Sequence, residues 1–274
     1  MTANVARHFE QFNSAWRDIG VDLLRNGFAL FTGSLFEGDG RDLFAAREAF
    51  IASCRDLPCD PYSAASGRNR RYGRFVLDPW SGGLDAVPPV WDGDRNDYVA
   101  HYRQLGSFNP EHSGGLRAFA PLTDVQTRNR FLHSLITRSF FAIPPRWERP
   151  VVVGIHILQY APEGNQCVAS SPASFHCDGE PFTWSFLIER TNVAGGENIF
   201  ATLDAVGKGL AELSPNDIRA RVTLETPMDG WVVDDFRVSH FVSPFKAAEG
   251  AASGKRTLLI IDFTPAAPGF DPRN

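Results

Sequence analysis

The sharpest local feature of the chain is the stretch SFHCDG at residues 174–179. In an extended segment, side chains two residues apart point to the same face, so His176 and Asp178 can reach one metal ion together. His240, near the end of a later apolar run, is the expected third ligand. Two imidazoles and one carboxylate form a facial triad, which suits Fe(II) because it leaves three coordination positions open.

Arg256 is the second feature on which this interpretation depends. A His-x-Asp pair arises easily by chance, and the simple alternative is a surface histidine followed by a turn aspartate before Gly179. Arg256 begins the run RTLLIIDF, and a strand returning beside the one before His240 would place its guanidinium deep in a pocket. A planar bidentate donor there matches the distal carboxylate of a dicarboxylic acid. The competing interpretation is a solvated arginine at the start of a strand.

The pattern on both sides of these residues predicts an α+β protein. After residue 150, short apolar or alternating runs separated by turns are typical of a sandwich or barrel. The expected strands lie at 151–160, 182–189, 197–202, 221–226, 230–234 and 256–263, with a tight turn at Gly195 and Gly196. Before residue 150, helices are expected at 4–26, 42–54 and 124–141, a strand at 28–31, and loops with short strands over 58–115.

The composition limits the classes of partner. With 43% hydrophobic and 22% charged residues, the 274-residue chain has the balance of an ordinary globular protein. Its net charge of −5 and the lack of long basic runs argue against nucleic-acid binding. No apolar run approaches the ~18 residues of a membrane span, and residues 1–12 lack a secretory signal, so a cytoplasmic protein is expected. The four cysteines have no zinc-site spacing and are expected to be reduced thiols.

Five blocks around the candidate ligands resemble a known family and occur in the same order. They are GIHILQY (154–160), FHCDGEP (175–181), AGGENIF (194–200), SHFVSP (239–244) and KRTLLIIDF (255–263). Over residues 150–265 the chain is similar to the bacterial Fe(II)/2-oxoglutarate dioxygenases related to L-isoleucine hydroxylases and N-substituted amino-acid hydroxylases. The resemblance implies a double-stranded β-helix (jelly-roll) core with N-terminal and flanking helices. It also implies iron at His176, Asp178 and His240, and 2-oxoglutarate held by Arg256.

The same resemblance implies a reaction and a domain arrangement. The expected enzyme hydroxylates an aliphatic carbon of a free or N-modified amino acid or a similar small molecule, using O₂ and releasing succinate and CO₂. The expected organisation is a single dioxygenase domain over 1–274. Within it, a helical N-terminal elaboration (1–149) contributes segments of the substrate pocket, and the jelly-roll catalytic core covers 150–265. The expected partners are an amino-acid-like small molecule and, at most, a second copy of the chain as a homodimer.

An alternating basic and aromatic segment suggests where the substrate binds. Arg68, Arg70, Tyr72 and Arg74 share one face of a strand, and related hydroxylases carry a similar segment near this point. We expect some of these side chains to bind the carboxylate of the substrate, and a solvated basic edge strand is an equal alternative. Gln159 stands where the family usually has an arginine, so it is a further candidate substrate contact and a sign of a different substrate.

Other polar residues have simpler predicted roles. His156 is expected to be structural and satisfied by local hydrogen bonds. Asp234, Asp235 and Asp262 are expected to be solvated in a loop and at a strand end, and the alternative is that they support the metal ligands from behind. Cys177 is expected to point away from the metal into the core, because it lies between two residues that point toward it.

Two rival functions stay open at the level of the sequence. The first is a facial-triad metalloenzyme that does not use 2-oxoglutarate. The second is a jelly-roll binding or sensor protein that holds a small ligand without turnover. Replacing Arg256 discriminates the first from the expected dioxygenase, and a test for succinate discriminates the second.

Overall fold

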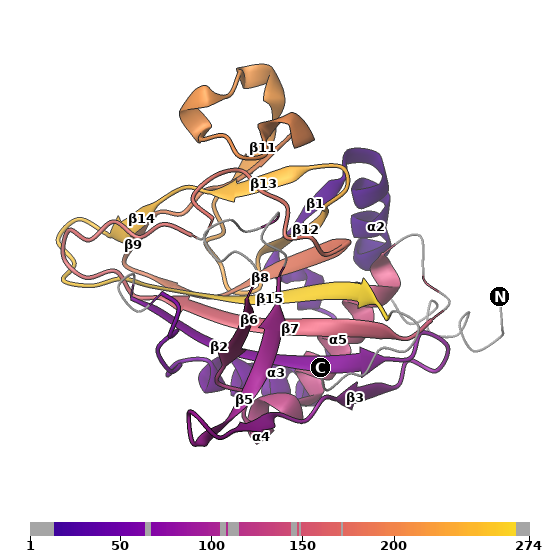
Figure 1. Ribbon diagram of the computed structural model, residues 1–274. Coiled ribbons are helices and arrows are strands. Elements are labelled where there is room, and N and C mark those ends of the chain that lie inside the picture. Colours follow the sequence, from indigo (N-terminus) through magenta and orange to yellow (C-terminus); the bar gives the residue numbers. More distant parts are fainter. Residues whose placement is uncertain are drawn as a thin grey trace.

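A seven-stranded antiparallel sheet forms the base of the molecule (Figure 1). In this computed structural model the described residues are 14–63, 67–104, 108, 115–143, 147, 149–170 and 172–266. The strands of the sheet follow one another in the order β1-β12-β8-β15-β7-β2-β3. Their bounds are Phe28–Phe31 (β1), Arg68–Leu77 (β2), Leu84–Ala86 (β3), Val151–Tyr160 (β7), Phe182–Thr191 (β8), Gly230–Asp234 (β12) and Lys255–Pro265 (β15).

A smaller layer of strands lies over one face of this sheet (Figure 1). In it β10 pairs with β11 and β13, and β9 pairs with β14. The bounds are Val193–Gly195 (β9), Asn198–Ala201 (β10), Ile218–Val222 (β11), Ser239–Val242 (β13) and Phe245–Ala247 (β14). The chain passes repeatedly from one layer to the other, as it does between β12 and β13. The fold is therefore a jelly roll, and the expected double-stranded β-helix core is confirmed.

A third sheet contributes side chains to the space between these two layers. Its strands are Val90–Asp92 (β4), Asp97–Arg103 (β5) and Leu116–Phe119 (β6), paired in the order β4-β5-β6. Tyr102 on β5 and Arg117 on β6 both line the cavity described below. The segment before residue 150 therefore supplies part of the site as well as helices.

Helices cover the opposite face of the main sheet. They are Ser14–Asn26 (α2), Arg41–Ser53 (α3), Asp124–Thr127 (α4) and Arg130–Ala142 (α5). In α2 the buried residues Trp16, Ile19 and Leu23 recur at three- and four-residue spacing, which gives one apolar face. They share one core with Ile155 and Ile157 of β7. Because side chains alternate along a strand, the even-numbered residues of β7 face the smaller layer instead. None of the described helices is long and apolar enough to cross a bilayer.

The predicted helices agree with the structure in type and differ in their bounds. The helix expected over 4–26 begins at Ser14 among the described residues, and residues 1–13 lie outside them. The helix expected over 42–54 is α3. The single helix expected over 124–141 is wrong, because two helices occupy this segment. Asn129 divides them, since its side chain caps α5 by accepting from two backbone N–H groups of the first turn.

The predicted strands at 28–31, 151–160, 182–189, 230–234 and 256–263 are confirmed as β1, β7, β8, β12 and β15. The strand expected at 221–226 is wrong, since β11 ends at Val222. Segment 58–115 was expected to hold short strands, yet β2 runs for 10 residues along the whole of β7. Strand β15 lies between β7 and β8, so β8 separates it from β12. The expected pairing of β15 with the strand before His240 is therefore wrong, because the chain changes layers before His240.

Candidate functional site

Three side chains meet between the layers as a candidate metal centre. One donor atom each from His176, Asp178 and His240 lies within 4.8 Å of the others. The two histidines belong to segments far apart in the sequence, joined by a backbone bridge. The His176 N–H donates to the His240 carbonyl at 3.0 Å, and the His240 N–H donates back at 2.9 Å. This bridge sets the two imidazoles side by side, with ring centroids 4.4 Å apart.

The orientation of the rings favours a divalent cation. The Nδ1 of His176 lies 2.9 Å from the carbonyl oxygen of Ser174, which places the proton on Nδ1 and leaves Nε2 as a lone-pair donor. The Nε2 atoms of His176 and His240 lie 3.7 and 3.4 Å from the carboxylate of Asp178. Two imidazoles and one carboxylate, all turned to one point, fit Fe(II) with open positions.

Asp235 lies directly behind this centre. One carboxylate oxygen accepts a hydrogen bond from the backbone N–H of Gly179 at 2.8 Å, and the other lies 3.9 Å from Nδ1 of His240. Burial, followed by the nearby charge of Asp178, raises the pKa of Asp235 to about 9. Asp235 and Asp262 are both buried, so the expected solvation of these carboxylates is wrong. Asp234 is only partly buried and caps the following turn through the Phe236 N–H.

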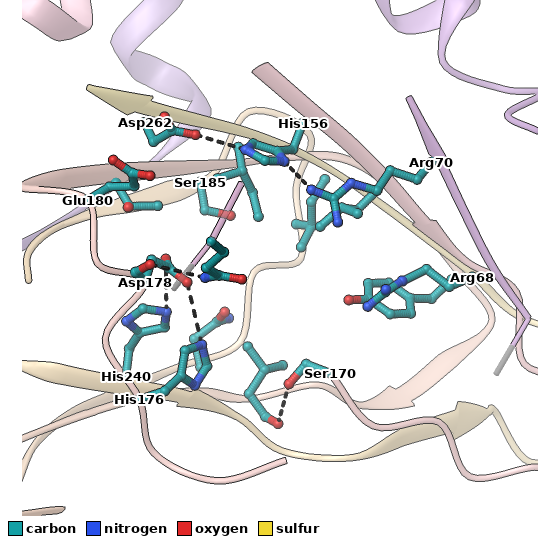
Figure 2. Close-up of a pocket in the computed structure, with 18 of the residues that line it drawn as sticks. Arg68, Arg70, His156, Ser170, His176, Asp178, Glu180, Ser185, His240 and Asp262 are labelled. Atoms are coloured by element: carbon teal, nitrogen blue, oxygen red, sulfur yellow. Dashed lines mark hydrogen bonds and ion pairs between the residues drawn. The ribbon is translucent and has the colours of Figure 1, made fainter. Parts of the chain in front are cut away.

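A cavity of about 900 Å³, counting its open mouth, extends from the candidate ligands between the layers (Figure 2). Arg256 lines it and is 1% exposed. Its Nε and Nη2 atoms are buried and have no hydrogen-bond partner among the described residues. Burial lowers the pKa of Arg256 to about 10, yet the group stays cationic at neutral pH. Two parallel donors without a partner fit a carboxylate of a bound acid such as 2-oxoglutarate.

The side of the cavity formed by β2 and β6 is basic. Arg68, Arg70 and Arg117 all line it. Arg68 is neutralised by Asp60 at 2.7 Å. Arg70 and Arg117 have no carboxylate within 4.0 Å among the described residues, although both stack on aromatic rings. Arg117 donates to the amide oxygen of Gln104 at 2.9 Å. Two buried guanidinium groups without an acidic partner favour an anionic group on the ligand.

His156 lies between Arg70 and the carboxyl group of Asp262, which with Glu180 forms the acidic wall of the cavity. Its Nδ1 accepts from Arg70, and its Nε2 lies 2.8 Å from a carboxylate oxygen of Asp262 (Figure 2). Burial and the charge of Arg70 hold the pKa of His156 well below its usual value, so the ring is neutral. The prediction that hydrogen bonds satisfy a buried His156 is confirmed. Gly154 lets Asp262 approach, since a Cβ on Gly154 would lie 2.3 Å from the carboxylate.

Glu180 completes this acidic wall. It lines the cavity and accepts a hydrogen bond from the hydroxyl of Thr264. Burial, then the charge of Asp262, raises the pKa of Glu180 to about 8. Burial likewise raises the pKa of Asp262 to about 7. The cavity therefore has buried carboxyl groups with raised pKa values on one side and guanidinium groups on the other.

The segment 68–74 divides into two parts in the structure. Arg68 and Arg70 line the cavity. Tyr72 is buried beneath it, packed on His156 and Tyr102 with ring centroids 4.5 and 5.1 Å away. Arg74 lies farther along β2 and is not part of the cavity wall. The interpretation as a solvated edge strand is wrong, because β2 lies between β7 and β3 and carries buried arginines.

Gln159 lies on the helix-facing side of β7. Its amide nitrogen donates to the carbonyl oxygens of Cys54 and Arg55 at 3.3 and 2.9 Å. The prediction that Gln159 contacts substrate is therefore corrected, since the side chain points away from the cavity. The thiol of Cys177 contacts the carbonyl oxygen of Val238 at 3.7 Å and lies outside the ligand group, as expected, but it is half-buried and not in the core.

Three polar residues of the site were missed as site residues from the sequence. Glu180 follows the His-x-Asp-Gly motif directly, and this adjacency was a usable signal. Asp235 was considered as a support for the ligands, but solvation was preferred because an Asp-Asp pair is common in turns. Arg117 had no signal, because β6 reaches the cavity only through the third sheet.

Comparisons with known proteins agree with this geometry. The chain is 24% identical over 259 residues to 3(1)-hydroxy-L-isoleucine 4-dioxygenase of Pantoea ananatis, covering 90% of this chain and 95% of that protein. It is 24% identical over 202 residues to L-isoleucine-4-hydroxylase of Bacillus thuringiensis, covering 72% and 75% of the two chains.

Solved structures share the fold. IDO from Bacillus thuringiensis matches with a TM-score of 0.70 and 18% identity, over 92% of this chain and 100% of that chain. A bsmA homologue from Methylobium petroleophilum matches with a TM-score of 0.72 and 20% identity, over 91% and 93%. The model of the 2OG-Fe dioxygenase family matches residues 52–262, which span the cavity and all three candidate ligands. The chain therefore belongs to the 2OG-Fe dioxygenase family and is a 2-oxoglutarate-dependent non-haem iron dioxygenase that uses Fe(II), 2-oxoglutarate and O₂.

Proposed function

We propose that this dioxygenase hydroxylates an aliphatic carbon of an amino-acid-like small molecule and converts 2-oxoglutarate to succinate and CO₂. His176, Asp178 and His240 hold the iron, and Arg256 holds the distal carboxylate of 2-oxoglutarate. The observation that carries the proposal is the pair of partnerless donors on Arg256, in the same cavity as the three convergent ligands. A metalloenzyme without a dicarboxylic co-substrate has no use for a buried cation at that point.

Bound Fe(II) supplies the oxidising chemistry in which O₂ is cleaved and one oxygen atom reaches the substrate. The protein holds 2-oxoglutarate and the substrate in position beside the triad. Arg256 fixes one end of 2-oxoglutarate, so that its keto acid end is directed toward the triad. Leu258 and Val242 are apolar residues that also line the cavity, where they limit the access of water. Asp178 fills a coordination position that a halide would need, which supports hydroxylation over halogenation.

The basic side of the cavity supports an amino-acid-like substrate. The relatives named above act on L-isoleucine or a hydroxylated form of it by their names. An α-amino acid brings a carboxylate, which is the group that Arg70 and Arg117 require. We therefore propose that these two guanidinium groups bind the substrate carboxylate, with the side chain of the substrate extending toward the triad.

One domain accounts for the whole described chain. Strands β1 and β2 come from the first third of the sequence, and both are internal or paired members of the sheet that carries β8 and β15. Cutting the chain near residue 150 would remove strands from this sheet. We therefore propose a single dioxygenase domain.

The test is succinate release from 2-oxoglutarate by protein reconstituted anaerobically with Fe(II) and then exposed to O₂. The twenty common L-amino acids and their N-acetyl derivatives serve as candidate substrates. We expect iron-dependent succinate that rises with at least one candidate, together with a product heavier by one oxygen atom in mass spectrometry. The His176→Ala variant serves as the blank. Iron-loaded, folded protein that forms no succinate with any candidate would overturn the proposal.

A further inference from the structure

Arg190 is a half-buried arginine outside the cavity wall, and the proposed function does not use it. It lies on β8 directly opposite Arg256 on β15, in an antiparallel pair. Directly opposed side chains point to the same face of a sheet, so both guanidinium groups lie on the face that carries the smaller layer. Like charges at such positions destabilise a sheet, so the pair is more easily explained by binding than by stability.

Arg190 holds the turn between β9 and β10. Its Nη2 atom donates to the carbonyl oxygens of Val193 and Gly195 at 3.1 and 2.7 Å. Strand β9 and its partner β14 lie over the end of the main sheet where β15 begins (Figure 1). Gly195 and Gly196 have φ values of +83° and +75°, which side chains other than that of glycine rarely allow. Arg190 therefore fixes a turn whose backbone requires glycine.

The same turn packs against Arg256. A Cβ added at Gly196 would lie 3.6 Å from Nε of Arg256 and 3.4 Å from Nη1 of Arg190, so the bare backbone lies close to both side chains. The ring of Phe245 lies 5.7 Å from the guanidinium carbon of Arg256. Tyr160 on β7 is the neighbour of Arg256 on the side away from Arg190. Arg256 is thus enclosed by two strands of the main sheet and by the turn above it.

We propose that Arg190 is a positioning residue that holds the Gly195–Gly196 turn against Arg256 and so directs this guanidinium toward the distal carboxylate of 2-oxoglutarate. The inference rests on the proposed function, in which Arg256 binds that carboxylate. Nε and Nη2 of Arg256 have no hydrogen-bond partner in the described part of the chain, so these two atoms do not fix its direction. The enclosing backbone does so, and Arg190 donates two hydrogen bonds to it.

The charge of Arg190 acts on the same point. Burial, and less strongly the charge of Arg190, lowers the pKa of Arg256 to about 10, while Tyr160 opposes this shift. Among the described residues, no carboxylate lies within 4.0 Å of either guanidinium group. A ligand carboxylate on Arg256 would therefore offset the repulsion between the two cations.

The experiment compares two 2-oxo acids that differ only at the distal end. 2-Oxopentanoate has the carbon chain of 2-oxoglutarate, with a methyl group in place of the distal carboxylate. Protein loaded with Fe(II) is titrated with each acid under anaerobic conditions, and calorimetry gives the Kd without turnover. The ratio of the two Kd values measures how strongly the protein recognises the distal carboxylate.

The wild-type protein should bind 2-oxoglutarate at least about tenfold more tightly than 2-oxopentanoate, as for one hydrogen bond to a charged group. Arg190→Gln should reduce this preference about threefold or more by weakening 2-oxoglutarate alone. Arg190→Lys can still donate to the two carbonyl oxygens and should keep most of the preference. Arg219→Gln, a change at an exposed arginine on β11, should keep all of it. General damage to the fold would weaken both acids equally.

A pair of glycine variants tests the turn itself. Gly196 and Gly250 both have positive φ, +75° and +79°, so alanine strains the backbone in both. Only at Gly196 would the new Cβ approach Arg256, since nothing lies within 4 Å of the one at Gly250. Gly196→Ala should therefore reduce the preference, and Gly250→Ala should leave it unchanged.

A double variant tests whether Arg190 acts through Arg256. In the Arg256→Gln background, Arg190→Gln should not change the Kd for 2-oxoglutarate further, because the group that it positions is gone. Losses that add in the double variant would overturn the inference.

An undiminished preference in Arg190→Gln, or an equal loss for both acids in it, would also overturn the inference. Where Arg190→Gln does not fold, the two glycine variants decide the question, and equal preferences in them count against the inference. A wild-type protein without any preference for 2-oxoglutarate would overturn it together with the role of Arg256. The proposed function fails separately, when wild-type protein forms no iron-dependent succinate with any candidate.

Discussion

Asp235 accepts a hydrogen bond from the backbone N–H of Gly179 at 2.8 Å, and this contact joins the end of β12 to the segment that carries two candidate ligands. The second oxygen of the same carboxylate lies 3.9 Å from Nδ1 of His240. One buried side chain therefore touches both segments of the triad, although it ligates nothing itself. Residues in this position fix the orientation of metal ligands.

Asp235→Asn should weaken iron binding by about 10- to 100-fold, the usual range for loss of a group that orients metal ligands. The amide keeps one acceptor oxygen but replaces the other carboxyl oxygen with an NH₂ group, so it cannot present an oxygen to both Gly179 and His240. Iron affinity is measured by competition with a chelator, and far-ultraviolet circular dichroism checks the fold. Asp234→Asn is the matched control, because Asp234 caps a turn through the Phe236 N–H and does not touch the triad. Equal loss in both variants would contradict a role specific to Asp235.

Arg256→Gln should raise the KM for 2-oxoglutarate by about 10- to 150-fold, because a hydrogen bond to a charged group contributes ~1.5–3 kcal/mol. The KM for the amino-acid substrate should change little. Steady-state kinetics with each co-substrate varied in turn measures both constants. An unchanged 2-oxoglutarate KM would show that the carboxylate binds elsewhere.

Arg70→Ala should raise the KM for the substrate at least tenfold while leaving the 2-oxoglutarate KM near its wild-type value. The reason is that Arg70 on β2 and Arg256 on β15 lie on opposite sides of β7. Arg74→Ala removes the same charge from the same strand outside the cavity wall, so it is the matched control. If Arg74→Ala raised the substrate KM more than Arg70→Ala, the substrate would bind farther along β2 than proposed.

Asp262 should make the metal-free protein less stable as pH rises from about 4 to 7. Burial raises its folded-state pKa from 3.8 to about 7, so the folded state holds a proton that the unfolded state has already released over this window. The stabilisation is full below the unfolded pKa and is lost as pH rises through the folded one. One such group changes the unfolding free energy by at most ~1.4 kcal/mol per pH unit.

The check is urea unfolding with a chelator present at pH 5 and pH 8, for the wild type and Asp262→Asn. The difference in unfolding free energy between the two pH values should be smaller in the variant, which has no proton to lose at that position. The asparagine oxygen can still accept from His156, so the hydrogen bond itself is kept. A pH dependence equal to that of the wild type would mean that Asp262 is ionised throughout this range.

The candidate ligands could be predicted because they depend on local rules. His176 and Asp178 are two residues apart, so any extended backbone turns them to the same side. The pairing of His176 with His240 is tertiary, and only the order of the family blocks suggested it. The alternation of side chains along β7 also indicated that Gln159 does not face the cavity and so does not contact the substrate. It lies an odd number of residues from His156, so the two side chains must point to opposite faces.

The polar network around the triad could not be derived in the same way. Asp235 and Asp262 have the sequence context of solvated turns and strand ends, and only the packing of two layers buries them. Arg117 enters the cavity from a sheet whose position no local pattern encodes. The helix boundary at Asn129 was missed because the apolar spacing continues through it. The side chain of Asn129 caps a new helix there, so the helix before it ends.

The two faces of β7 suggest how the enzyme could be redesigned. His156, Leu158 and Tyr160 face the cavity, whereas Ile155 and Ile157 belong to the core beneath the helices. A library confined to the first set would vary the cavity and leave the core shared with the helices intact, although Leu158 and Tyr160 also pack on Val168 and Phe245. Randomising the second set would change the stability of the fold without changing the cavity wall. One strand thus separates, residue by residue, the positions open to directed evolution from those closed to it.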